Sequence, residues 1–159
     1  MMSNTDKVRD LWRAFNQRNW QAVTANLADD FGFYDNTLGF GGIGKQSFAD
    51  YMQAFISKMS DINIFEIDCI EAEGLVVSIA SSQGTSDGEE FLPGLPANGK
   101  RSGVRFCVIW RFDNAGRITG CEGFYDMLTY LVELGHTTIA PAHEVLHPEI
   151  PPHVAAHYV

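Results

Sequence analysis

The spacing of hydrophobic residues changes once along this chain, and that change limits the folds open to it. Val8, Leu11 and Phe15 recur at the spacing of one helix face, and residues 46–59 repeat that spacing. Over residues 62–126 hydrophobic residues alternate with others instead, as they do along half-buried strands. A helical first part and a strand-rich second part predict an α+β domain.

Two pairs of long strands account for most of the second part. Segments 62–71 and 74–84 flank the sequence EAEG, and segments 101–113 and 117–126 flank DNAG. Each pair reads as two antiparallel strands joined by a tight turn. We therefore expect the helices to pack on one face of a curved antiparallel sheet.

The chain between the two long helices is less regular. Trp20, Val23 and Leu27 predict a second, shorter helix that ends at the sequence ADDF. The sequence FGFYDNTLGFGGIG, rich in glycine and aromatic residues, follows it and predicts a short strand running into a loop.

Length and charge exclude several classes of protein. The chain has 159 residues, the size of one domain, with a formal charge of −9 and a pI near 4.8. Nucleic acids and anionic membranes bind positive faces, so we expect neither as a partner. No apolar run reaches the ~18 residues of a membrane span, and the first residues lack a signal-peptide pattern. We therefore expect a cytoplasmic protein.

All five histidines lie after residue 135, in a segment that we interpret as a His/Pro-rich tail (136–159) appended to the domain (1–135). The tail contains HEVLH at 143–147, a pattern with which a helix can place two histidines on one zinc ion. Pro148 follows directly and disfavours helical geometry at the residue before it, while Pro141 leaves fewer than two helical turns between the prolines. We therefore predict no metal site and no cofactor.

Three stretches of the second part follow one another in a recognisable order. They are GTSDGEEFLPGLPANGKR from Gly84, VIWRFDNAGRI from Val108 and FYDMLTYLVELG from Phe124. Together they resemble the SnoaL-like polyketide cyclases, a branch of the nuclear transport factor 2-like superfold. The opening sequence RAFNQRNWQAVTANLADDF is similar to the first helices of that family, so the resemblance covers about residues 5–135. It implies a cone-shaped, cystatin-like fold with three N-terminal helices roofing the sheet, an apolar pocket inside, and a homodimer.

The resemblance implies a general acid/base at Asp126, because the family uses an aspartate at the start of its last helix in an intramolecular aldol closure. Strand alternation puts Asp126 on the face of Ile118 and Phe124. Poor solvation there would raise the pKa of the carboxyl toward the range useful for proton transfer. An aspartate that begins a helix is also a common N-cap, and the two roles are compatible.

Two positions depart from the family. Ser86 stands where the family has a histidine, which removes a group able to polarise a carbonyl. Glu122 stands where many members have a tryptophan. Four strand residues span roughly 13 Å, so Glu122 and Asp126 should not share a proton. We expect Glu122 to line the pocket as a polar group, to pair with an arginine, or to act as a second acid.

Asp35 is a further candidate carboxylate. The sequence YDNTLG around it resembles the segment of ketosteroid isomerases that carries their aspartate base. Leu11 and Val108 stand near the positions of the isomerases' tyrosine and second aspartate, so the oxyanion hole of those enzymes is missing and steroid isomerisation is not expected. The alternative is a turn residue whose carboxylate binds its own backbone.

We expect the pocket to take a small apolar molecule. The aromatic and apolar residues expected to line it are Trp12, Phe15, Phe55, Phe106, Val108, Trp110, Phe124 and Tyr130.

Two classes of function follow. The first is a cofactor-free cyclase or isomerase/lyase that acts on a small apolar carbonyl compound. The second is a non-catalytic ligand-binding or dimeric assembly protein of the same superfold, which the loss of the histidine would allow. An epoxide hydrolase needs an Asp-Arg-Asp arrangement, but alternation places Arg105 and Arg111 on the face opposite the apolar stripe.

The other face of the strands carries the prediction of a homodimer. Alternation places Cys107, Ile109, Cys121 and Tyr125 there, a set too apolar to leave in contact with water.

Overall fold

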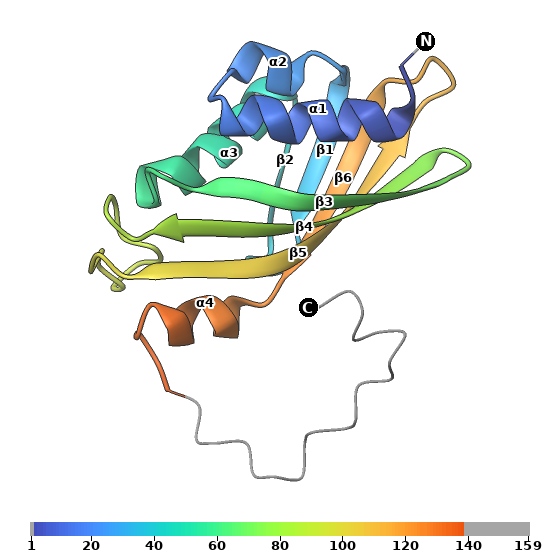
Figure 1. Cartoon of the computed structure of the whole chain (residues 1–159). Helices are drawn as coiled ribbons and strands as arrows, with labels where there is room; N and C mark the ends of the chain where they lie inside the picture. Colours follow the sequence, from blue (N-terminus) through green and yellow to red (C-terminus); the bar gives the residue numbers. More distant parts are fainter. Residues whose placement is uncertain (1, 139–159) are drawn as a thin grey trace, which may run out of the picture.

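The structure, a computed structural model, describes residues 2–138 and confirms the predicted fold class. Helices α1, α2 and α3 lie together over a curved six-stranded sheet, and α4 lies at another end of the molecule (Figure 1). The elements follow the chain as α1 (Asn4–Asn16), α2 (Trp20–Thr24), β1 (Leu27–Asp35), β2 (Phe40–Ile43), α3 (Lys45–Lys58), β3 (Asn63–Ala72), β4 (Leu75–Thr85), β5 (Arg101–Phe112), β6 (Ile118–Tyr125) and α4 (Met127–Glu133).

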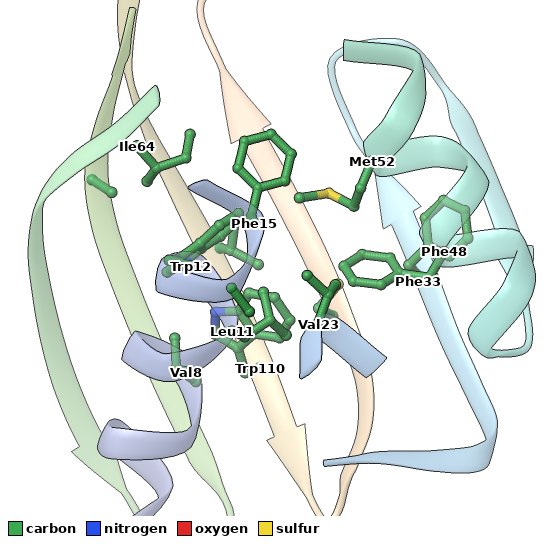
Figure 2. Close-up of a cluster of buried hydrophobic side chains, with 14 of the residues drawn as sticks. Val8, Leu11, Trp12, Phe15, Val23, Phe33, Phe48, Met52, Ile64 and Trp110 are labelled. Carbon is green, nitrogen blue, oxygen red and sulfur yellow. The ribbon is translucent and has the colours of Figure 1, made fainter. Parts of the chain in front are cut away.

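The first helix buries the face that its spacing predicts. Ser3 caps α1 by accepting a hydrogen bond from the backbone N–H of Asp6 at 3.1 Å, and Val8, Leu11 and Phe15 are buried. Figure 2 shows Trp12 and Phe15 of α1 facing a second group formed by Phe33, Phe48 and Met52. These groups hold the helices and the sheet together, since burying each large side chain contributes about 1.5–3 kcal/mol.

The sheet is mixed rather than wholly antiparallel. Its strand order is β2-β1-β6-β5-β4-β3, and every neighbouring pair is antiparallel except β1 and β6. The predicted second helix is shorter than its spacing indicated, because Leu27 already belongs to β1. A parallel partner needs a long crossover, so local periodicity could not reveal the pairing of β1 with β6.

A bulge in β6 reverses the predicted alternation of that strand. Phe112 pairs with Ile118, but the preceding residue of β5 pairs with Gly120, which leaves Thr119 as an extra residue. One extra residue turns every later side chain to the opposite face. Cys121 and Tyr125 therefore border the internal pocket, and their predicted place on the outer face is wrong.

Two predictions concern residues that the structure does not describe. The HEVLH pattern lies in residues 139–159, which are not described, as does most of the predicted tail. Within residues 2–138 no helix has the length and apolar character needed to cross a bilayer.

Candidate functional site

A pocket lies inside the cone, between the helices and the concave face of the sheet. The eight residues predicted to line it are among those that border it, together with Tyr51, Cys121 and Tyr125. Of the eight, Phe124 follows the bulge, pairs with Cys107 and is 40% exposed, so its predicted place on the inward face of β6 is wrong. The pocket is narrow and open at its mouth, with a cavity volume of about 90 Å³. Contact of these residues with a ligand stays a prediction.

The lining is almost entirely apolar. Among the described residues, no lysine, arginine, histidine, aspartate or glutamate borders the pocket. The polar side-chain groups of its lining residues are tyrosine and serine hydroxyls, tryptophan N–H groups and the thiol of Cys121. A ligand that fits this lining is therefore largely uncharged, or carries a single charged group that lies against the few polar groups of the wall.

Tyr51 and Tyr125 of the pocket wall are hydrogen-bonded to a buried carboxylate, that of Asp35. Asp35 ends β1 and is 1% exposed, and it is not itself among the lining residues. The hydroxyl of Tyr51 donates to Asp35 Oδ2 at 2.7 Å, and the hydroxyl of Tyr125 donates to the same oxygen at 3.1 Å. The carboxylate is thus one hydrogen bond away from two groups that border the pocket.

The other oxygen of Asp35 holds the following turn. Its Oδ1 accepts the backbone N–H groups of Thr37 and Leu38, both at 2.9 Å. The turn role considered for Asp35 is therefore present, and the link to the pocket is present beside it. The Thr37 hydroxyl also exchanges hydrogen bonds with the backbone of Tyr125, which fixes the turn against the end of β6.

The four donors around Asp35 suit an ionised carboxylate. A carboxylate accepts all four hydrogen bonds, whereas a neutral carboxyl would have to donate one. Among residues 2–138 no basic side chain forms an ion pair with Asp35. A buried carboxylate with no cation beside it is costly to a fold and marks a candidate site.

Burial, followed by the negative charge of Asp35, raises the pKa of Tyr51 well above its ordinary value. The same two causes, in the same order, raise the pKa of Tyr125. Both phenols therefore stay protonated and keep donating to Asp35.

Two more polar features lie along the pocket wall. The hydroxyls of Ser82 and Tyr130 share a hydrogen bond of 2.9 Å, and both residues are buried. The indole N–H of Trp12 is buried and has no hydrogen-bond partner in the part of the chain that the structure describes. This donor is packed among aromatic rings, with the ring of Phe106 at 5.3 Å and that of Trp110 at 5.6 Å between centroids.

Asp126 does not border the pocket, and its predicted burial and raised pKa are wrong. The side chain is exposed and caps α4, accepting the backbone N–H of Leu128 at 2.9 Å and the hydroxyl of Thr129 at 2.7 Å. The hydrogen bond from Thr129 is the largest cause of a pKa below the ordinary aspartate value. The bulge in β6 reverses the alternation from which the inward position was predicted.

Glu122 points to the outer face of the sheet for the same reason. Nη2 of Arg111 donates to Glu122 Oε1 at 2.8 Å, so of the three roles considered for Glu122 the structure has the arginine pair. Arg105 lies within 4 Å of Glu66 and Asp68, at 3.9 and 3.6 Å, and neither arginine borders the pocket. The placement predicted for both arginines is confirmed.

Ser86 is buried, and it is not among the residues that line the pocket. Its hydroxyl has no hydrogen-bond partner among the described residues. No group of three or more histidine, cysteine, aspartate or glutamate side chains within residues 2–138 is arranged to hold a metal ion.

Sequence reasoning missed Tyr51 and Tyr125. Tyr51 lies three residues after Phe48 and four before Phe55, so helical spacing places a phenol on the apolar face of α3. That spacing is a signal from which Tyr51 could have been found. Tyr125 carried no such signal, because its direction depends on the bulge.

Comparison with known proteins agrees with this fold. The sequence pattern of the family described as SnoaL-like polyketide cyclase matches residues 6–134. A search among curated protein sequences found no match.

Several solved structures share the fold. A candidate polyketide cyclase from Xanthomonas campestris is 23% identical, with a TM-score of 0.71, covering 83% of this chain and 99% of that protein. IdmH, a candidate polyketide cyclase from Streptomyces antibioticus, is 20% identical, with a TM-score of 0.73 and coverages of 84% and 99%. A Catenulispora acidiphila protein with a ketosteroid isomerase-like fold, solved in complex with trimethylamine, is 16% identical, with a TM-score of 0.69 and coverages of 84% and 97%.

Proposed function

Because the chain belongs to the SnoaL-like polyketide cyclase family, we propose that it is a cofactor-free acid–base enzyme of the cyclase or isomerase/lyase type. Its substrate is a small, apolar carbonyl compound bound in the conical pocket. The observation that carries this proposal is the buried Asp35 carboxylate, which pairs with no cation among residues 2–138 and is hydrogen-bonded to two tyrosines of the pocket wall. An apolar enclosure of this kind suits proton transfer next to a carbonyl.

The proton would move through a tyrosine, because Asp35 does not itself border the pocket. The phenolic oxygen of Tyr51 or Tyr125 takes a proton from the carbon next to the substrate carbonyl, while the phenol passes its own proton to Asp35 Oδ2. The pKa of each tyrosine is raised, so a free tyrosinate is disfavoured and the two transfers occur together.

The same relay can complete a ring closure. The enolate formed in the first step attacks a second carbonyl of the substrate and forms a carbon–carbon bond. The resulting alkoxide takes the proton back from the tyrosine, which recovers its own from Asp35. Atoms and charges balance without an added cofactor, and the enzyme returns to its starting state.

A probe for this chemistry is 5-nitrobenzisoxazole, whose ring opens to a coloured phenolate when a base removes its ring C–H proton. We expect Asp35→Asn to lower the rate by at least ~100-fold, the scale typical of losing a general base. Tyr51→Phe and Tyr125→Phe, each made alone, identify the tyrosine that relays the proton. Asp126→Asn is the matched control and should leave the rate unchanged, because Asn keeps the helix cap. A rate that survives Asp35→Asn, or disappears in Asp126→Asn, would reject the relay.

The second candidate is a ligand-binding or dimeric assembly protein without catalysis. It is favoured by Ser86, which is not among the pocket residues and stands where the resemblance places a histidine. This alternative predicts that the pocket binds ligands and that no variant changes the rate of proton transfer. Since the Catenulispora protein was solved in complex with trimethylamine, we take that amine as one probe of binding to this chain.

A further inference from the structure

The two tyrosines that reach Asp35 both border the pocket, so their hydroxyls are the groups through which a ligand there can be linked to the carboxylate. Each phenol has one hydrogen, and both hydrogens are directed at Asp35 Oδ2, at 2.7 and 3.1 Å between oxygens. What each phenolic oxygen can still offer a ligand is its lone pairs. The ligand group at this place must therefore be a donor.

The charge behind the tyrosines favours a positive donor. Asp35 is buried, and among the described residues no lysine or arginine pairs with it. A buried negative charge is weakly screened, so a cation on the pocket side of the phenols is attracted more strongly than at the protein surface.

Aromatic rings surround the same place. The ring of Tyr51 lies 4.9 Å from that of Phe33 and 5.1 Å from that of Phe55, between centroids, and all three residues border the pocket. Tyr125 lies 5.9 Å from Tyr130. Ring faces attract ammonium groups within about 6 Å, most strongly where water is excluded.

We propose that this end of the pocket binds the protonated amine of an otherwise apolar ligand. The ammonium N–H donates to the phenolic oxygen of Tyr51 or Tyr125, each phenol donates to Asp35, and aromatic rings enclose the hydrocarbon part. The inference rests on the pocket and its hydrogen-bond directions, not on the proposed reaction. An amine so bound would occupy the place of the carbonyl substrate and would inhibit its turnover.

Benzylamine and benzyl alcohol form a matched pair of probes, because they share a ring and a linker and differ in charge. Titration calorimetry of the full chain at pH 7, where benzylamine is protonated, should give at least ~10-fold tighter binding of the amine, or about 1.4 kcal/mol. Equal binding of the two, tighter binding of the alcohol, or binding of neither at millimolar concentration would overturn the proposal.

Asp35→Asn tests the direction of the hydrogen bonds. The Asn oxygen can still accept from the backbone of Thr37 and Leu38, while its NH₂ donates to the tyrosine oxygens. The phenolic hydrogens then turn toward the pocket, which becomes a donor site. We expect the preference for benzylamine to be lost and acetophenone, an acceptor, to bind more tightly than to the wild type.

Glu122→Gln is the matched control for overall charge, because it removes one carboxylate from the outer face. The preference for the amine should persist in this variant. Its loss there, or its survival in Asp35→Asn, would reject Asp35 as the cause. If Asp35→Asn does not fold, the Tyr51→Phe/Tyr125→Phe double variant must lose the amine and retain the alcohol. Binding is measured separately from proton transfer, so either proposal can fail alone.

Discussion

Replacing Asp35 by Asn and by Ala separates the stability that its hydrogen bonds to the turn contribute from the effect of its negative charge on stability. Both variants remove the buried charge, but only Asn retains an acceptor for the backbone N–H groups of Thr37 and Leu38. The difference between the two variants therefore measures those two hydrogen bonds. Both donors are only part-buried, so at about 1 kcal/mol for each hydrogen bond lost, Ala should be about 2 kcal/mol less stable than Asn.

The comparison of Asn with the wild type measures the charge itself. Removing a buried charge that forms no ion pair with any described residue recovers desolvation energy, which offsets the weaker hydrogen bonds of a neutral acceptor. We therefore expect the free energy of unfolding of Asp35→Asn to lie within about 1 kcal/mol of the wild-type value or above it. Such a result is typical of a site that keeps a destabilising group for its function. The assay is urea unfolding followed by tryptophan fluorescence, with thermal melting as a check, where 1 kcal/mol shifts the midpoint by about 2–4 °C.

Two results would refute this reasoning. Equal stability of the Ala and Asn variants would show that Asp35 does not hold the turn. A loss of more than about 3 kcal/mol in Asp35→Asn would show that the charge is net stabilising, and the fold would then account for Asp35 without a functional role.

Other outcomes follow from individual contacts. Trp110→Phe should destabilise the protein by about 2–4 kcal/mol in urea unfolding, because it removes buried surface and leaves the hydroxyl of Ser78 without its 2.9 Å partner. Adding Ser78→Ala should recover part of that loss. Strict additivity of the two changes in stability would contradict the contact. Glu122→Gln should change stability by less than about 1 kcal/mol, because its ion pair is exposed, and a larger loss would point to an interface over that face. The homodimer stays a prediction, now resting on Ile109 and Cys107; light scattering that gives the monomer mass of 17.6 kDa at micromolar concentration would reject it.

Periodicity predicted the parts of the fold that depend on neighbours along the chain. The buried face of α1 and the inward stripe of β5 follow from local spacing, which is why spacing alone placed Phe15, Val108 and Trp110 on faces that turn inward. The expectation that those faces enclose a pocket came from the resemblance to the family. The order of motifs over residues 84–135 indicated the family and hence the cone. Both inferences use information that a short stretch of sequence contains.

The candidate site depended on contacts that no short stretch contains. Tyr51 is 16 residues from Asp35 and Tyr125 is 90 residues from it, and they meet because β1 pairs in parallel with β6 while α3 packs over β1. A single extra residue at Thr119 decided which side chains of β6 face inward, bringing Tyr125 to the pocket and turning Glu122 away. The sequence determined the elements and their apolar faces through local spacing. Only the tertiary structure decided which carboxylate is buried, because burial depends on strand pairing and register across the whole sheet.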